Sequence, residues 1–313
     1  MEQCILSVII AAHNAGNYIE ECLASLDDSL EKLPEKYTVE AIIINDTSSD
    51  NTLEKINNYK ESNFIKRVFS VEFKNVGKVR RFAFTKCSGK YITVLDSDDA
   101  LCKNSITLIM DYLVSGKYDL IMTPLNEIIG NNKIKQTTSS LDKIKKLNNS
   151  EACTFFLKQK EVQGHLIGKF IKTENLSVMH FPEISCYEDM ITTSYAVEKS
   201  TVALYINTKI YLYRKRDGST SHDRDGSKIL KMQYVLEQMS NIFKKPESKP
   251  MLDALWVKLA SDILSRSGGK LKIPEEIKTR VKCINLIAFL MNINIRMSRK
   301  KALMKLKIKI NKL

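Results

Sequence analysis

The sequence predicts an α/β fold: a mostly parallel sheet flanked by helices, with a helical extension at the C-terminal end. Three observations lead to this prediction. Apolar β-branched runs alternate with helical patterns over the first 123 residues, acidic or polar residues directly follow several of these runs, and helical patterns dominate from about residue 227. Strands that alternate with helices are typical of a parallel sheet covered by helices on its faces.

The expected strands span residues 5–11, 39–44, 65–73, 91–95 and 120–122, and the helices between them span residues 17–30, 50–59, 79–86 and 104–113. Within the first helix, Ile19, Cys22, Leu23 and Leu26 recur at the spacing of one helical face. Residues 124–164 read as a polar surface excursion and residues 165–222 as a second mixed block.

Four further helices are expected at residues 229–243, 251–265, 275–291 and 296–310. We therefore expect two domains, with the sheet in residues 1–222 and a helical, basic extension in residues 223–313. Trp256 lies among apolar residues at helical spacing and is expected in a core.

The charge of the chain is concentrated at its C-terminal end. The formal net charge is +13, and from residue 270 onward 13 Lys or Arg stand against Glu275 and Glu276, which places +11 in this segment. The remaining residues are nearly neutral. A nucleic-acid-binding body is thereby excluded, because it would need basic residues along its own surface.

Seven cysteines are scattered singly, without a C-x-x-C pair, which is typical of reduced thiols in a cytoplasmic protein. The N-terminal apolar run is short and lacks a basic leader, so we expect a buried strand there and no signal peptide. No window reaches about 18 uninterrupted apolar residues, so no membrane-spanning helix is expected. The expected location is cytoplasmic, with peripheral contact to the inner face of the cell membrane as one option.

The stretch TVLDSDDAL (93–101) places three carboxylates directly after an apolar strand. His13 and Asn14 follow the first expected strand and Asp46 follows the second, so all these residues should meet at one edge of the sheet, where such folds bind ligands. Close carboxylates favour a divalent cation among them, and oxygen ligands suit Mg²⁺ or Mn²⁺ bound partly through substrate phosphates. The alternative is a polar turn that caps the next helix.

Several motifs occur in a fixed order. SVIIAAHNAGNYIEECLASL, VEAIIINDTSSDNT and NVGKVRRFAFTKCSGKYITVLDSDD are followed by GKFIKTENLSVMHFPEISCYEDM and YLYRKRDGSTS. Together they resemble the inverting glycosyltransferase family 2 of the bacterial surface-polysaccharide type, over residues 5–222. The resemblance implies the GT-A (Rossmann-like) fold. The sequence departs from the family pattern at Ala12 and His13, where Pro and Tyr are usual, and at Asn45, where an Asp is usual.

The resemblance also implies roles for individual residues. It implies that Asp189 is the general base on the acceptor hydroxyl, with Glu188 beside it. A second group is implied to bind the donor, and it comprises Ala11, His13, Asn14, Asp46, Arg80, Asp96, Ser97, Arg216 and Ser219. The implied metal ligands are Asp98, Asp96 and His222, although His222 alternatively lies in a solvated loop. By contrast, His165 and His180 read as structural, and Arg214 and Lys215 as surface charges.

We therefore expect transfer of a hexosyl or N-acetylhexosaminyl group from a nucleotide-diphosphate donor, with UDP favoured, to a glycan or lipid-linked acceptor of capsule, O-antigen or similar synthesis. Mn²⁺ or Mg²⁺ is the expected cofactor. The alternative is a catalytically silent nucleotide-sugar-binding module. A dehydrogenase is excluded, because AAHNAGN has one glycine where a dinucleotide-binding turn needs three.

The C-terminal tail leaves three interpretations open. Its apolar residues lie among many lysines and are Met297, Ala302, Leu303, Leu306, Ile310 and Leu313. Such a pattern favours contact with an anionic membrane surface. It is also compatible with packing on a partner subunit or with a solvated, lysine-rich end.

Overall fold

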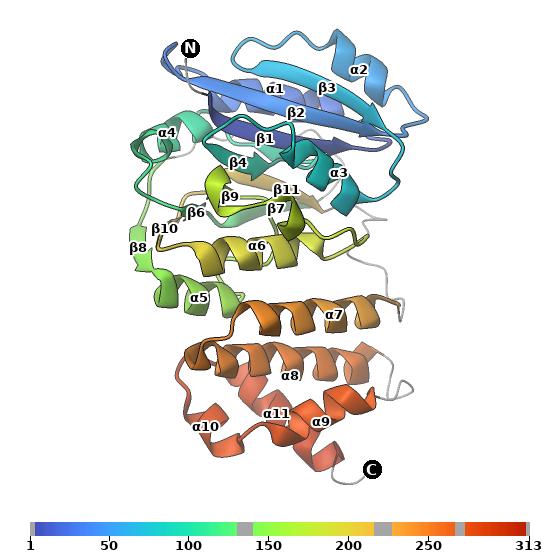
Figure 1. Ribbon diagram of the computed structural model, residues 1–313, viewed down its shortest axis with the longest axis vertical. Coiled ribbons are helices and arrows are strands. Elements are labelled where there is room, and N and C mark those ends of the chain that lie inside the picture. The colour runs from blue at the N-terminus through green and yellow to red at the C-terminus, as the bar shows by residue number, and fades with distance from the viewer. Residues whose placement is uncertain (1–3, 130–139, 216–226, 267–272, 311–313) are drawn as a thin grey trace. The chain divides into compact units, whose positions relative to one another are not determined.

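The computed structural model describes residues 4–129, 140–215, 227–266 and 273–310 (Figure 1). The chain divides into two compact units. One comprises residues 1–149 and 164–222, and the other comprises residues 150–163 and 223–313. Residues 150–163, which the sequence analysis grouped with the sheet, thus fall in the second unit.

Four parallel strands form one half of the large sheet, in the order β3, β2, β1, β4. They are β1 (Cys4–Ala12), β2 (Thr38–Asp46), β3 (Ile65–Val71) and β4 (Tyr91–Val94). Nearly every residue of β1 and β2 is buried, because both strands lie inside the sheet and are covered on both faces. The carboxyl ends of these strands therefore lie together at one edge.

The helices between these strands match the expected ones within a few residues. They are α1 (Ile19–Ser29), α2 (Thr52–Asn58), α3 (Val76–Phe84) and α4 (Ser105–Ser115). Helix α3 starts earlier than expected because the Asn75 side chain accepts a hydrogen bond from Lys78 N at 3.1 Å and caps the helix. It packs against β1 and β2 and lies in front of the sheet in Figure 1.

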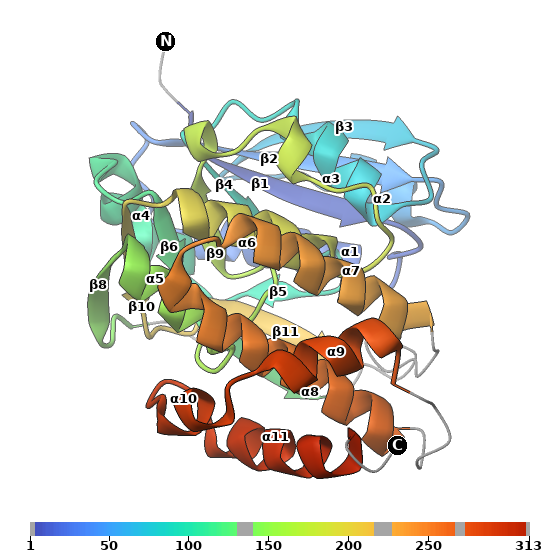
Figure 2. The same ribbon diagram turned by 60° about the horizontal axis from the view of Figure 1, so that its bottom comes forward.

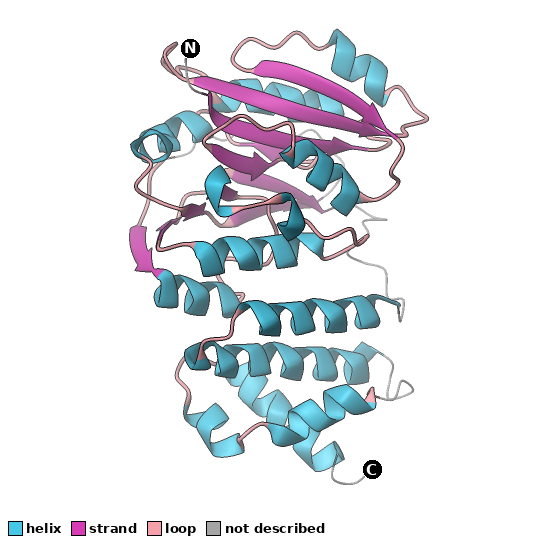
Figure 3. Cartoon of the chain, viewed as in Figure 1, coloured by secondary structure: helices cyan, strands magenta, loops and turns pink. Residues whose placement is uncertain are grey.

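The other half of the large sheet is mixed. Its order after β4 is β9, β6, β10, β8, and β9 (Lys169–Lys172) runs antiparallel to both β4 and β6 (Leu120–Met122). β10 (Val202–Ile206) is parallel to β6, and β8 (Ile144–Asn148) forms an antiparallel edge (Figure 3). The predicted α/β class is confirmed, and the antiparallel strands make the sheet mixed.

A second, three-stranded sheet lies in the same unit, in the order β5 (Ala100–Leu101), β11 (Tyr211–Lys215), β7 (Leu125–Ile129). The prediction of an irregular excursion over residues 124–164 was therefore wrong, because this stretch holds β7, β8 and α5 (Asn149–Leu157). The pairing partners of β7 and β8 lie more than 50 residues later in the chain, so local periodicity did not indicate them. Helix α6 (Glu188–Lys199) completes the unit.

The second unit is helical (Figure 2). Its later helices are α7 (Ser227–Ile242), α8 (Lys249–Arg266), α9 (Glu275–Cys283), α10 (Leu286–Met291) and α11 (Met297–Ile310). The expected single helix over residues 275–291 is broken, because Ile284 is extended and Asn285 accepts a hydrogen bond from Ala288 N at 3.0 Å to cap α10. Trp256 is buried in α8, as expected.

Three of the apolar residues of the tail pack inside the helical unit, whereas Met297 is exposed. Leu303, Leu306 and Ile310 are buried, and α11 packs with this face against α8 and α9. This stripe therefore belongs to the core of the helical unit and is not open to a membrane. Leu313 lies outside the described residues. Within the described part of the chain, no helix combines the length and the apolar character needed to cross a bilayer.

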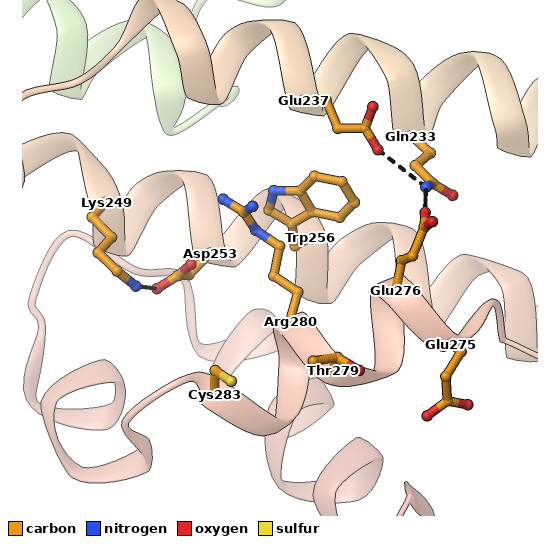
Figure 4. Close-up of a pocket in the computed structure, with 10 residues that line it drawn as sticks. All are labelled: Gln233, Glu237, Lys249, Asp253, Trp256, Glu275, Glu276, Thr279, Arg280 and Cys283. Carbon is orange, nitrogen blue, oxygen red and sulfur yellow. Dashed lines mark hydrogen bonds and ion pairs between the residues drawn. The ribbon is translucent and has the colours of Figure 1, made fainter.

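A cavity of about 710 Å³ lies among α7, α8 and α9 (Figure 4). The Arg280 guanidinium lies over the Trp256 ring, 4.7 Å from its centroid. Gln233 donates to Glu237 within α7 and to Glu276 on α9. These contacts join the three helices, and none of the residues with a predicted role in catalysis or donor binding lines this cavity.

Candidate active site

The loops after β1 and β2 are tied to each other at the sheet edge. His13 Nδ1 lies 2.6 Å from the backbone oxygen of Asp46, and Asn14 Oδ1 accepts a hydrogen bond from Ser49 N at 2.9 Å. Asn14 has a φ of 48°, a left-handed conformation that Asn adopts more easily than most residues. Ala11 lies beside Ile44 in the parallel register. The exposed His13 and Asn14 therefore lie at the edge of the sheet where β1 and β2 end.

Asp46 is largely buried and organises the next loop. Its carboxylate accepts hydrogen bonds from Phe73 N at 2.7 Å, Lys74 N at 3.0 Å and Asn75 N at 3.2 Å. Three backbone donors satisfy most of the lone pairs of one carboxylate. Asp46 thereby fixes the loop that leads into α3 and sets the position of that helix.

The D-S-D-D segment (residues 96–99) follows β4, and residues of β11 form hydrogen bonds with it. The hydroxyl of Tyr211 accepts from Asp96 N at 2.9 Å and donates to Asp99 Oδ2 at 2.8 Å. Asp99 Oδ1 accepts from Arg214 N at 2.8 Å. Burial, together with the negative charges of Asp96 and Asp98, raises the pKa of Asp99 to about 8. The position of β11 thus determines the shape of the acidic turn.

Arg214 supports this turn, so its prediction as a surface charge was wrong. Its side chain is only 1% exposed, its Nε donates to the backbone oxygen of Asp98 at 3.0 Å, and its Nη2 pairs with Glu21 at 2.7 Å. Its position at the start of the basic run Arg214-Lys215-Arg216 gave no sign of burial, because its burial depends on the pairing of β11 with β5. Lys215, in contrast, is partly exposed and pairs with Glu127 at 2.5 Å.

The residues present fit a divalent cation bound partly by a substrate. Asp96 and Asp98 are partly exposed, and the buried Asp99 accepts from Tyr211 and Arg214. The described residues hold no group of three His, Cys, Asp or Glu side chains arranged around a metal. One or two carboxylates completed by phosphate oxygens and water are the usual Mg²⁺ arrangement, and oxygen ligands also suit Mn²⁺. His222, Arg216 and Ser219 lie outside the described residues.

Arg80 joins the acidic turn to the start of α6. It is 6% exposed, its Nη2 pairs with Asp96 Oδ1 at 2.7 Å, and its Nη1 pairs with Glu188 Oε1. Its neighbour Arg81 pairs instead with Glu183 at 2.8 Å, on a half-exposed surface. The acidic turn and the Glu188-Asp189 pair, about 90 residues apart in sequence, thus meet in one site.

Glu188 and Asp189 form the first turn of α6 and differ in their surroundings. Burial raises the pKa of Glu188 to about 7; the nearby Arg80 opposes this rise and the charge of Asp189 adds to it. Burial also acts to raise the pKa of Asp189, but the hydrogen bond and charge of His165, together with Arg80, outweigh it and lower that pKa. Asp189, whose side chain is 19% exposed, is therefore the better candidate for a charged base.

Two residues near Asp189 were not predicted to have a role in the site. His165 Nδ1 lies 3.2 Å from Asp189 Oδ2, although only a structural role was predicted for His165. Lys169 is fully buried, and burial lowers its pKa to about 7 although the charge of Asp189 opposes this. Its place in Gly168-Lys169, within a motif block, was the available signal for Lys169; nothing in the sequence indicated His165.

Comparison with known proteins agrees with this architecture. The family described as Glycosyl transferase family 2 matches residues 7–174. The putative teichuronic acid biosynthesis glycosyltransferase TuaG of Bacillus subtilis (strain 168) is 24% identical over 221 residues, which cover 70% of this chain and 82% of TuaG.

Two solved structures are similar in fold. S. aureus TarS 1–349 in complex with UDP-GlcNAc has a TM-score of 0.64 at 20% identity, covering 98% of this chain and 88% of that chain. The mannosyltransferase PcManGT from Pyrobaculum calidifontis, in complex with GDP-Man and Mn²⁺, has a TM-score of 0.53 at 13% identity, covering 98% and 86%.

The family match covers more than half of the chain and extends from β1 through β9. It includes the loops after β1, β2 and β4, where His13, Asp46 and the acidic turn lie. The resemblance found in the motifs is thereby confirmed. The chain belongs to glycosyl transferase family 2 and is a glycosyltransferase with the GT-A fold.

Proposed function

We propose that this glycosyltransferase moves a sugar from a nucleotide-diphosphate donor, with UDP as the nucleotide, onto a hydroxyl of a surface-glycan or lipid-linked acceptor, with inversion at the anomeric carbon. The observation that carries the proposal is Arg80, which pairs with both Asp96 and Glu188 and so unites the acidic turn with the carboxylates of α6. The names of the similar proteins support it: TarS was crystallised with UDP-GlcNAc, PcManGT with GDP-Man and Mn²⁺, and TuaG is described in teichuronic acid biosynthesis. An N-acetylhexosaminyl group is the sugar we favour.

In this proposal the donor is bound by residues at the edge of the sheet and by the segment after β11. Ala11, His13 and Asn14 line the nucleotide-base pocket with Asp46, and Ser97 with Asp96 lies toward the ribose. Arg216 and Ser219 contact the diphosphate. Mn²⁺ or Mg²⁺ bound at Asp98 and Asp96, with His222 as a further ligand, would neutralise charge on the departing diphosphate.

The acceptor side centres on α6. The acceptor oxygen attacks the anomeric carbon, the bond from that carbon to the diphosphate oxygen breaks with its electron pair leaving on the diphosphate, and Asp189 takes the hydroxyl proton. A positioned base of this kind accelerates transfer by roughly 10²–10⁴-fold. Glu188 is a poorer base for this step, because Arg80 already occupies Oε1 and the side chain is buried. One displacement without a covalent intermediate gives inversion.

Donor binding and turnover test this assignment. With Mn²⁺ present, UDP-GlcNAc should raise the melting temperature of the wild type, and UDP should be released when acceptor is added. Asp98→Asn should lose both effects while remaining folded. Asp111→Asn is the matched control, because Asp111 is an exposed acid on α4. UDP release that continues unchanged in EDTA would contradict the metal assignment, and donor binding without any turnover would favour a silent binding module.

We further propose peripheral contact with an anionic membrane through the outer face of α10 and α11. Ile287 and Met291 are one helical turn apart on α10 and are both 76% exposed, and Ile293 after α10 is 92% exposed. On α11, Met297, Met304 and Ile308 are exposed and, at 100° per residue, lie within about 20° of one direction, opposite the buried Leu306 stripe.

Basic residues surround this exposed set. Lys300, Lys301 and Lys305 lie beside it on α11, and residues 273–310 hold ten Lys or Arg against two Glu. Each basic residue near an anionic surface contributes on the order of 1 kcal/mol, and apolar side chains add shallow insertion. This charge favours anionic lipid over an uncharged partner surface.

Vesicle co-sedimentation tests the membrane proposal. The wild type should bind phosphatidylglycerol vesicles in a salt-dependent manner and should not bind phosphatidylcholine vesicles. Ile287→Ser with Ile293→Ser should lose this binding. The control pair is Ile65→Ser with Ile144→Ser, which removes two exposed isoleucines from edge strands of the sheet. Binding that survives the first pair of changes, or that ignores salt, would contradict the proposal; a self-associating face would instead show as a concentration-dependent oligomer.

A further inference from the structure

His165 lies in the turn before β9, between two glycines that shape its approach to α6. A Cβ on Gly164 would come within 2.3 Å of Met190 Cγ, so the turn lies directly against the first turn of α6 only because residue 164 has no side chain. Gly168 has a φ of 70°, which glycine adopts without strain. The backbone is therefore shaped to bring His165 to the start of α6.

The imidazole is fixed between two elements. Its ring stacks on Tyr213 of β11, with centroids 6.1 Å apart and planes 27° apart. Its Nδ1 lies 3.2 Å from Asp189 Oδ2, while Asp189 Oδ1 accepts from Met190 N at 2.8 Å. Counting donors from the described residues, each oxygen of the proposed base has one, so lone pairs remain on this carboxylate to accept from an acceptor hydroxyl.

We propose that His165 is a positioning residue for catalysis: it holds the Asp189 carboxylate in the orientation and charge state needed to take the acceptor proton. The inference rests on the proposed function, in which Asp189 is the base. His165 itself needs no contact with the sugar. The arrangement follows a general pattern, in which a catalytic base is oriented by a third group through a hydrogen bond.

The charged groups around Asp189 set the expected sign of the effect. Arg80 from α3 and Lys169 from β9 face it, Glu188 precedes it on α6, and His165 reaches it from the turn before β9. Burial acts to raise the pKa of Asp189, and His165 contributes most to the lowering that outweighs burial. Without His165, that pKa should rise, and the pH below which the base is protonated should rise with it.

The test uses four substitutions in the full chain: three at histidines and Asp189→Asn. His165→Phe removes the donor and the charge, and His165→Asn keeps an N–H near the position of Nδ1. His180→Asn is the control, because His180 stacks on Tyr195 at 4.3 Å and its Nδ1 accepts from Ser177 N instead of donating to a carboxylate. kcat, the donor KM and the pH profile of kcat are measured for each variant.

His165→Phe should lower kcat by about 10- to 100-fold with the donor KM nearly unchanged, because a misplaced base slows the chemical step only. The acid limb of its pH profile of kcat should move to higher pH by about 1 unit, which corresponds to the loss of one hydrogen bond to a charged group. His165→Asn should recover most of kcat with a smaller shift. His180→Asn should behave as the wild type.

Two outcomes would overturn the inference. In the first, His165→Phe keeps the wild-type kcat and the wild-type acid limb in its pH profile. In the second, His165→Asn and His165→Phe lose kcat equally and the pH profile of kcat does not shift. If Asp189→Asn is inactive while His165→Phe is fully active, only the role of His165 is wrong. If Asp189→Asn is itself active, the proposed base is wrong, so the two failures are distinguishable.

Discussion

Replacing Arg80 by Met tests the link between the two halves of the site. Arg80 is buried and pairs with Asp96 at 2.7 Å and with Glu188, whose side chain is 7% exposed. Met keeps the length and apolar character of the side chain but leaves Glu188 buried without a cation. Breaking a buried ion pair from one side costs about 3–5 kcal/mol. In a domain of 150–250 residues, each kcal/mol lowers Tm by about 2–4 °C, so we expect a fall of about 6–20 °C.

The stability lost in Arg80→Met should depend on pH in a defined direction. The pKa of Glu188 is about 7 in the folded protein against an ordinary value of 4.5, so its contribution favours folding below 4.5 and declines as pH rises to 7. Without Arg80 this pKa rises further, and the decline continues above pH 7. The destabilisation should therefore be larger at pH 8 than at pH 6, by up to about 1.4 kcal/mol for the one pH unit between 7 and 8.

Thermal unfolding of Arg80→Met and Arg81→Met at both pH values measures this difference. Arg81 is the matched control, because it lies next in the same helix and pairs with Glu183 at 2.8 Å, but both side chains are more than one third exposed. Such exposed pairs contribute about 0–1 kcal/mol. Equal loss of Tm in the two variants, or a loss in Arg80→Met that does not change with pH, would refute the reasoning.

Two further substitutions test a hydrogen bond that stabilises the acidic turn in the first unit and a core side chain in the helical unit. Tyr211→Phe removes the hydroxyl that bridges Asp96 N and Asp99, so stability should fall by about 1–3 kcal/mol and donor affinity should fall with it, as followed by denaturant unfolding and titration with UDP. Leu306→Ala deletes a buried side chain of α11 and should cost about 2–5 kcal/mol in unfolding of the helical unit; a loss below 0.5 kcal/mol, as at an exposed position, would show that α11 is not part of that core.

The first half of the fold was predictable because its strands and helices have strong local periodicity. Strands β1–β4 and β6 and helices α1–α4 were located within a few residues, and the motifs after them indicated the edge where Asp46 and Asp96 lie. The antiparallel β9 and the sheet of β5, β11 and β7 were missed, because they are stabilised by pairing partners distant in sequence. Distant pairing leaves little signal in a local window.

The same limit explains the site residues that were missed. The burial of Arg214 follows from β11, and the contact of His165 with Asp189 follows from a turn that packs on α6. For the tail, the sequence showed that apolar residues lie on the helix α11. It did not show which side faces the core, because a helix with two apolar sides can bury either one. Leu306 faces the core, while Ile308 is exposed.

The kcat of Asp189→Asn, compared with that of Glu188→Gln on the same donor and acceptor, tests the central claim most directly. Asp189 is partly exposed and its pKa is lowered, whereas Glu188 is buried and bound to Arg80. We expect Asp189→Asn to lose about two to four orders of magnitude in kcat with UDP-sugar and Mn²⁺ affinity nearly unchanged. An active Asp189→Asn beside an inactive Glu188→Gln would contradict the account.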